Sequence, residues 1–288
     1  PSQITEIKPK PDSYISGLTD VDIEKLRVHK SQILLTCSGT IGNISYVSKT
    51  LNNQIFSHDL IRMTSHTETD SGYIYAFLKT NIGQLLIKTN NYGSVISHIE
   101  PKHLENILIP NPPEILKKEI HNLVVKSYNL RDESNDLIDE AEKMLIEELK
   151  VPPIEDFKPK YFDNENDIRN FEVSLSKLNN RFDGSYHIPI IDCIKKHLQK
   201  YALSIKYINN GLNAQIILPG RFSRTYVDEN QGIKFVGGKD LFQLNPSTEK
   251  FLSKRVHEKI IQTQLGIKEN DLIMPSRGTI GRLLLAPK

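Results

Sequence analysis

The sequence contains little cysteine and no long run of apolar residues. Cys37 and Cys193 are its two cysteines among 288 residues, and they stand far apart in unlike contexts. Such a pair supports neither a disulfide framework nor a cysteine-based zinc site, and it fits a reducing cytoplasm. Apolar runs such as 283–286 fall far short of the ~20 residues that a membrane-spanning helix needs. No signal peptide is visible, so we expect a cytoplasmic protein without membrane contact.

Recognisable catalytic motifs are also missing. The nine histidines form no HExxH pair, no Gly-x-Ser-x-Gly elbow occurs, and no carboxylate–lysine cluster suggests a nuclease centre. The segment 111–114 reads Asn-Pro-Pro-Glu, whereas DNA adenine methyltransferases carry Asn-Pro-Pro followed by an aromatic residue that stacks on the extruded base. We therefore expect no catalytic residue, metal or cofactor in residues 1–288, with catalysis in partner chains or in a domain outside them.

The net charge of +2 conceals an asymmetry along the chain. Residues 1–113 are neutral, and residues 114–150 carry 6 basic against 10 acidic side chains. Residues 151–175 are also acidic, whereas residues 176–288 carry 18 basic against 9 acidic side chains. A basic balance of this size is typical of domains that meet a polyanion, although a solvated basic surface without a ligand gives the same count.

Shorter elements are expected on both sides of the chain's middle. Apolar patterns predict three strands within residues 30–63, a helical segment at 72–89 with a break at Gly83, and a strand at 104–110. Later in the chain they predict a helix at 189–201 and strands near 214–218 and 232–236.

One long helix is expected in the middle of the chain. Residues 114–150 contain neither proline nor glycine, and Pro112 and Pro113 precede them as prolines often precede a helix. Apolar residues recur every seven positions, with a row of small residues between them, which favours packing against a second long helix. The residues of this expected interface are Leu123, Ser127, Leu130, Ser134, Leu137, Ala141 and Met144.

An internal repeat governs the organisation of the chain. The tetrapeptide Gly-Thr-Ile-Gly begins at Gly39 and again at Gly278, 239 residues later, with matching apolar positions before and after it. Each copy predicts a strand, a tight turn and a second strand, and a period of this length indicates a duplicated domain. We expect the glycines to supply positive φ angles in the turn. The alternative is close approach of the backbone to a phosphate.

Several segments, taken in order, resemble the DNA specificity (S) subunits of type I restriction-modification systems. Similar target-recognition regions are fused to some adenine methyltransferases. The matching segments are QILLTCSGTIG, YGSVISHIEPKHLENILIPNPPEI, DLIDEAEKMLIEEL, VSLSKLNNRFDGSYHIP and DLIMPSRGTIG. The resemblance implies two target recognition domains that each read half of a split DNA site, separated by long helices that set the spacing.

The resemblance also implies the domain boundaries and the partners. We expect an α+β chain in which residues 1–111 are the C-terminal part of one β-rich recognition domain and residues 112–150 are a spacer helix of coiled-coil type. An acidic linker would follow at 151–175, and the N-terminal part of a second recognition domain at 176–288. Because both domains look partial and the first residue is Pro1, we expect a longer gene product. Implied partners are double-stranded DNA, adenine methyltransferase subunits and a second copy of the chain. The restriction subunit of this phage-defence system would bind through the methyltransferase subunits.

Candidate DNA contacts follow from charge and turn position. Phosphate contacts suit basic side chains on loops, and base contacts suit polar side chains that reach a groove. For each residue alone, a role as a solvated surface side chain or plain turn stays open. The candidates are Arg221, Arg224, Lys234, Lys239, Arg277 and Thr279 in the basic half, and Ser38, Thr40, Asn90, Tyr92 and Ser94 in the first half.

Three classes of function remain open from the sequence. The first is a non-catalytic DNA-recognition subunit, which we favour. The second is the C-terminal specificity region of a fused adenine methyltransferase and restriction enzyme. The third is a coiled-coil scaffold that does not bind DNA.

Overall fold

The computed structural model describes most of the chain as two compact units. One unit comprises Pro1–Asn135 together with Pro219–Lys288, and the other comprises Asp136–Leu218. Helices and small antiparallel sheets alternate along the chain, which confirms the expected mixture of α and β structure. The described residues are 2–11, 14–18, 20–57, 59–89, 98–157, 171–178, 180–208, 212, 214–238, 240–246, 250–278 and 280–287.

The first module, residues 2–110, is built around a three-stranded sheet. Its strands are β1 (Ile33–Thr36), β2 (Ile44–Tyr46) and β3 (Leu60–Met63), in the order β2-β1-β3 and all antiparallel. The three strands that the sequence predicted here are confirmed. Two 3-10 turns, η1 (Ser2–Thr5) and η2 (Ile23–Leu26), precede them.

The central strand β1 is buried on both faces. Leu35 belongs to a cluster that includes Leu78 and Ile87 from the helices α1 (Glu68–Lys79) and α2 (Asn81–Thr89). Leu34, on the opposite face of the strand, packs with Ile4 of η1 in a second cluster. Because alternate residues of a strand point to opposite faces, the continuous apolar run Ile-Leu-Leu is required here.

The break between α1 and α2 lies at Thr80, not at Gly83 as the sequence suggested. Thr80 has extended backbone angles, and its Oγ1 accepts a hydrogen bond from the Gly83 N–H at 3.1 Å. Gly83 lies inside α2, where a Cβ atom would stand 2.3 Å from the carbonyl oxygen of Phe77. The glycine therefore permits the close approach of the two helices and does not interrupt the second one.

The segment 104–110, expected as a strand, is not one. A short helix, α3 (Pro101–Glu105), includes its first two residues, and the rest has no regular structure. Pro101 occupies the first turn, and Glu100 and His103 cap the helix reciprocally. These start signals outweigh the apolar pattern of the following residues.

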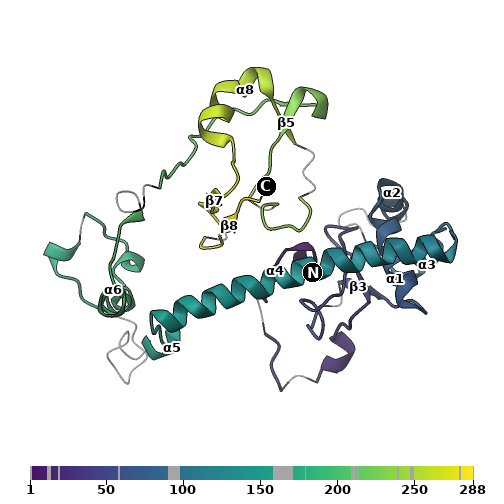
Figure 1. Ribbon diagram of the computed structural model, residues 1–288, viewed down its shortest axis with the longest axis horizontal. Helices are drawn as coiled ribbons and strands as arrows, with labels where there is room; N and C mark the ends of the chain where they lie inside the picture. Colours follow the sequence, from purple (N-terminus) through teal and green to yellow (C-terminus); the bar gives the residue numbers. More distant parts are fainter. Residues whose placement is uncertain are drawn as a thin grey trace. The chain divides into compact units, whose positions relative to one another are not determined.

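The long helix expected at 112–150 is confirmed as α4 (Glu114–Glu148), which Figure 1 shows without a break. It begins after Pro113 and ends four residues before Pro152, as the position of the prolines predicted. Its first 22 residues belong to the first unit, and the remainder belongs to Asp136–Leu218.

The described residues of the unit Asp136–Leu218 include the end of α4 and the helices α5 (Ile154–Phe157) and α6 (Pro189–Tyr201). Helix α6 has the bounds that the sequence predicted. Short 3-10 turns, η4 (Leu175–Lys177) and η5 (Gly184–Tyr186), precede α6. The ring of His197 on α6 lies 3.0 Å from the carbonyl oxygen of Leu149, and the Lys150 ammonium stands 5.3 Å from the Tyr201 ring.

The second module, residues 219–287, contains two small sheets. The first has the order β4-β6-β5 and the second pairs β7 with β8. Its elements are β4 (Tyr226–Val227), η6 (Glu229–Gln231), β5 (Gly232–Lys234), β6 (Phe251–Ser253), α8 (Lys254–Ile260), the π-helical turn η7 (Ile261–Leu265), β7 (Leu272–Ile273) and β8 (Leu284–Leu285).

The strand expected near 232–236 is confirmed as β5, whereas the one expected at 214–218 is wrong. Among the described residues, Ile216 and Leu218 pair with no strand, and both side chains are exposed. A run of apolar residues forms a strand only where a neighbouring strand takes up its backbone hydrogen bonds.

The repeat in the sequence is a repeat in the structure. Strand β1 pairs Ile33 with Tyr46, and β7 pairs Leu272 with Leu285, so both partners shift by the same 239 positions. The turn glycines have positive φ angles in both copies, as predicted: 67° and 92° at positions 39 and 42, and 76° and 91° at 278 and 281. Ser31 and Asn270, each two residues before the first strand of its copy, also have matching positive φ angles, of 70° and 68°.

The two copies differ in burial. Leu35 is completely buried, whereas Met274 at the equivalent position is 54% exposed. In the first copy β3, α1 and α2 cover the strand pair, and no such elements pack on β7 and β8 among the described residues. The reverse holds upstream, where Tyr-Ile-Ser at 14–16 resembles Phe-Leu-Ser at 251–253. Residues 251–253 form β6, the central strand of its sheet, whereas Tyr14 is 89% exposed. Among the described residues, each copy therefore packs a part of the repeat that the other leaves exposed.

This difference predicts unequal effects of the same substitution at equivalent positions. Leu35→Ala removes a fully buried side chain, so we expect the free energy of unfolding to fall by about 2–5 kcal/mol. Met274→Ala alters an exposed side chain and should change it by no more than about 0.5 kcal/mol. Urea denaturation followed by circular dichroism measures both, and equal losses would contradict the assigned difference in burial.

Candidate nucleic-acid interface

A cluster of exposed cations lies at one edge of the second module. Arg224 lies two residues before β4, and its guanidinium stands 5.1 Å from the ring centroid of Phe235 and 5.9 Å from that of Phe222. Lys234 at the end of β5 is exposed, and its Nζ donates to the carbonyl of Pro246 at 2.8 Å. The structure therefore places Arg224 against the ring of Phe235, the residue that follows Lys234, and leaves Arg221 exposed next to Phe222.

Buried His257 holds the backbone beneath this basic edge. Its Nε2 accepts the Thr225 N–H at 2.9 Å, and its ring lies 5.3 Å from that of Phe222. The Thr225 carbonyl in turn accepts the N–H of Ser253 on β6 at 3.0 Å. Because the segment 222–225 is fixed at both ends, Arg224 is presented from a defined backbone position.

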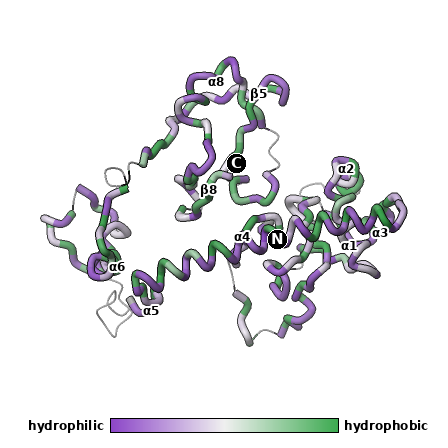
Figure 2. Tube along the Cα trace, viewed as in Figure 1, coloured by the Kyte–Doolittle hydropathy of each residue, from purple (hydrophilic) through white to green (hydrophobic). Residues whose placement is uncertain are grey.

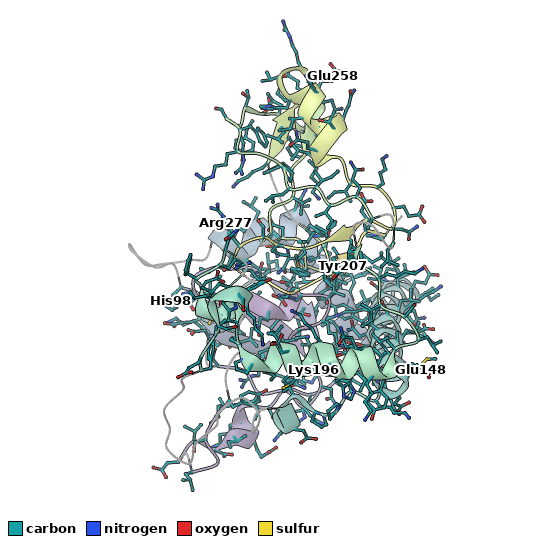
Figure 3. The ribbon with its side chains drawn as sticks, turned by 90° about the vertical axis from the view of Figure 1, so that its left-hand side faces the viewer. His98, Glu148, Lys196, Tyr207, Glu258 and Arg277 are labelled. Carbon is teal, nitrogen blue, oxygen red and sulfur yellow. The ribbon has the colours of Figure 1, made fainter. Side chains whose placement is uncertain are left out.

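Lys254 and Arg255 belong to the same region, although the sequence reading missed them. They open α8 directly after β6 and are exposed. Together with Ile233 of β5 they line a surface hollow, and Figure 3 shows side chains projecting on several sides of α8, where Glu258 is labelled. The signal that could have found them is a pair of adjacent basic residues immediately after a predicted strand. The basic edge is defined here as Arg221, Arg224, Lys234, Lys254 and Arg255.

The remaining candidates lie on other elements or outside the described residues. Arg277, labelled in Figure 3, is exposed on the turn between β7 and β8. The equivalent turn of the first module holds Thr40, which is exposed, and Ser38, which is partly buried and pairs through its backbone with His98. Outside the described residues lie Lys239, Thr279, Asn90, Tyr92 and Ser94.

The predicted packing residues of α4 form an exposed stripe. Leu123, Leu130, Leu137 and Met144 are 68%, 56%, 58% and 64% exposed, and they are called the heptad stripe below. The small residues between them, Ser127, Ser134 and Ala141, are exposed as well. Figure 2 shows apolar and polar residues alternating along the helix. Among the described residues nothing covers this apolar stripe.

The opposite side of α4 is occupied by the first module. The hydroxyl of Tyr128 accepts the N–H of Tyr46 on β2 at 3.0 Å and donates to the hydroxyl of Tyr75 on α1 at 3.1 Å. The ring of Tyr128 lies 5.6 Å from each of the other two rings, and burial raises the pKa of Tyr75 well above its usual range. The three tyrosines therefore form a cluster of hydrogen bonds and ring contacts between sheet and helix.

Near the start of α4, Lys117 makes a second contact with α1. Its ammonium donates to Asp70 at 3.3 Å and to Glu114 at 2.8 Å. The hydrogen bond to Glu114 raises the pKa of Lys117, while Thr67 and then Lys117 lower the pKa of Asp70. These contacts pair opposite charges at the beginning of α4.

Neither a metal cluster nor a membrane span appears in the part of the chain that the structure describes. There, no three His, Cys, Asp or Glu side chains converge in a way that would hold a metal ion. Within the same residues, no helix combines the length and apolar character that crossing a bilayer requires. The arrangement offers cations for phosphates and an apolar stripe for another helix.

The two sides of α4 predict opposite outcomes for two neighbouring substitutions. Tyr128→Phe leaves the buried N–H of Tyr46 without its acceptor, so we expect a loss of about 1–3 kcal/mol in the free energy of unfolding. Leu130→Ala, two residues away, truncates an exposed side chain and should cost no more than about 0.5 kcal/mol. Thermal unfolding of the two variants beside the wild type makes the comparison, and the opposite ranking would disprove the assigned orientation of the helix.

Comparison with protein families assigns the region that these contacts hold together. Residues 7–140 match the model of the type I restriction modification DNA specificity domain. The match covers most of the first module and the part of α4 that packs on it. A search of curated proteins found no match to the chain.

Proposed function

Through residues 7–140 the chain belongs to the DNA specificity family of type I restriction-modification systems, and we propose that it is the non-catalytic subunit that reads a split DNA site. Specificity domains of this family are recognition modules without catalysis. The observation that most supports a split site is the structural repeat, in which the same strand–turn–strand element recurs with one register and the same turn glycines. With two copies of one module, each copy would read one half-site.

The basic edge is the proposed site of phosphate contacts. Its five cations are exposed, and Arg224 is oriented by the rings of Phe222 and Phe235. Phosphate contacts fix the register of a protein on DNA but carry no sequence information. Base readout would then fall to the polar and charged turns, among them Arg277 in the second module and Thr40 in the first. The two turns share Gly-Thr-Ile-Gly, but Arg277 stands where the first copy has Ser38, as two unlike half-sites would require.

The heptad stripe is the proposed docking site for a second long helix. A row of leucines flanked by small residues is the surface that a close helix partner needs, whereas the net acidic charge of 114–150 disfavours DNA there. We propose that this helix comes from a second copy of the chain or from the rest of the same protein. Adenine methyltransferase subunits would dock on the assembled helices, and the restriction subunit through them.

Replacing cations of the basic edge should weaken DNA binding in a salt-dependent way. Each phosphate contact contributes about 0.9 to the slope of log affinity against log salt concentration. The triple variant Arg221→Ala, Arg224→Ala, Lys234→Ala should therefore reduce the slope by up to about 3 and weaken all sequences alike. Fluorescence anisotropy with duplex DNA at several salt concentrations, with and without the co-purified methyltransferase, measures the slope.

A matched control removes cations elsewhere. Lys118→Ala with Lys126→Ala takes two exposed lysines from α4, outside the proposed interface. Their loss should leave the slope unchanged. Salt-insensitive binding of the wild type, or a control that behaves like the triple variant, would exclude the basic edge as a phosphate-binding surface.

Polar substitution of the heptad stripe should abolish association without unfolding the chain. Leu130→Lys with Leu137→Lys places charges where a partner helix would pack, while the free chain should keep its melting temperature because both leucines are exposed. Light scattering after size exclusion and co-purification with the methyltransferase report the loss. Glu142→Lys, about 140° around the helix from Leu137, is the control that should associate normally.

A further inference from the structure

Three polar side chains on one turn of α4 are buried against the first module. Arg131, Asp132 and Asn135 are each less than a tenth exposed, although they belong to a helix whose other surface is open to solvent. Here they are called the polar clamp. Arg131 lies seven residues from both Val124 and Ile138, at a position where an apolar residue would continue the heptad pattern. Packing against another helix therefore does not explain this arginine.

Asp132 binds a tight turn that follows β2. Its carboxylate accepts the Ser48 hydroxyl at 3.0 Å, the Lys49 N–H at 3.0 Å and the Thr50 N–H at 3.1 Å, and also the Thr50 hydroxyl. Four donors around one buried carboxylate satisfy it from several directions. Such a contact fixes both the position of the helix along the turn and its rotation about its own axis.

Arg131 and Asn135 bind a different part of the first module. The guanidinium of Arg131 donates to the carbonyls of Ile7 and Glu6, both at 2.8 Å, and Asn135 donates to the carbonyl of Ile7 at 3.0 Å. These carbonyls belong to residues 4–7, called the junction segment. Its Ile4 is completely buried in the core of the first module. The helix is thus held at two separate points of one rigid body.

The junction segment also pairs with the second module. Ile7 donates its N–H to the carbonyl of Phe242 at 2.9 Å, and Leu244 donates to that of Thr5 at 2.8 Å. Glu6 forms an ion pair with Arg282 at 2.9 Å, and this guanidinium stacks 4.0 Å from the ring centroid of Phe242. The four residues of the junction segment therefore contact the core of the first module, the clamp on α4 and the second module.

We propose that Arg131, Asp132 and Asn135 are positioning residues that hold both modules at a fixed orientation to α4 and thereby set the spacer length of the split site. This inference rests on the proposed function. One additional base pair moves a half-site by about 3.4 Å and turns it by about 35° around the DNA axis. Modules fixed to one helix cannot follow that movement, whereas modules that rotate on a loosened clamp can.

Asp132→Asn is the sharpest test because it keeps the shape of the side chain. Its amide places a donor where the carboxylate received donors, so part of the contact with residues 48–50 is lost. A cavity of about 330 Å³ adjoins Asp132 and is lined by Lys49 and Asn129 among others. Water can therefore solvate the groups that lose their partner, and we expect the variant to fold. Glu133→Gln, an exposed neighbour on the same helix, is the matched control.

In the experiment, the full chain with its co-purified methyltransferase selects binding sites from random duplex DNA. The affinity for the selected site is then measured at each spacer length. The wild type and Glu133→Gln should prefer one spacer over its neighbours by about tenfold or more, the cost of a mismatched base pair. Asp132→Asn should keep both half-site sequences and lower this preference below about threefold. An unchanged spacer preference, or a loss of the half-site sequences themselves, would overturn the proposal.

A spectroscopic readout separates this inference from the proposed function. Spin labels at Gln54→Cys in the first module and Lys126→Cys on α4, both exposed and in the same compact unit, report their distance by electron–electron double resonance in a Cys193→Ser background. Asp132→Asn should broaden a distribution that is narrow in the wild type. If the wild type selects no split site, the proposed function fails, and this measurement alone then decides whether the clamp positions the helix. An equally narrow distribution in the variant would refute it.

Two further variants cover the case in which Asp132→Asn does not fold. Asn135→Ala removes one donor to Ile7 and should widen the accepted spacers in the same way. Glu6→Arg opposes Arg282 and should lower the spacer preference, and the double variant Glu6→Arg, Arg282→Glu should restore it. Restoration by the reversed pair is expected of a positioning contact and not of general destabilisation, so its absence counts against the proposal.

Discussion

The contact between α4 and the first module is the constraint on which the rest of the structure depends. A sheet of three short strands closes its core with α1 and α2, but the turn after β2 and the junction segment remain polar and require partners. Tyr128, Arg131, Asp132 and Asn135 supply these partners from successive turns of one helix face. Hydrogen bonds need particular positions of donor and acceptor, so these contacts favour one arrangement of the helix on the module.

The same contact divides the surface of α4 between two tasks. The face that carries the clamp contacts the first module, whereas the heptad stripe on the other side is exposed. The part of the chain that matches the type I restriction modification DNA specificity domain, residues 7–140, includes both the first module and the clamp. Under the proposed function, α4 connects a module that reads DNA to a surface on which a second helix packs.

The two modules are alike in local geometry and unlike in burial. The hairpins 33–46 and 272–285 share their register and the positive φ angles of their glycines because these depend on short-range sequence. Burial depends on what packs against the hairpin, and β3, α1 and α2 accompany only the first copy among the described residues. Leu35 thus contributes to a core in the first copy, whereas the equivalent Met274 lies on the surface of the second.

The sequence by itself determined the local elements: the long helix between prolines, α6, the strands around both turns, the turn glycines and the family. It failed at 104–110 and 214–218, where capping or the lack of a pairing strand outweighed an apolar pattern. It also selected Arg224 and Lys234 but missed Lys254 and Arg255, because proximity across β4, β6 and β5 is not visible along the chain. Only the tertiary structure decided which face of α4 is buried. A heptad pattern records where apolar residues recur, whereas Arg131, Asp132 and Asn135 are buried by hydrogen bonds to residues more than 80 positions away, and no periodicity records those.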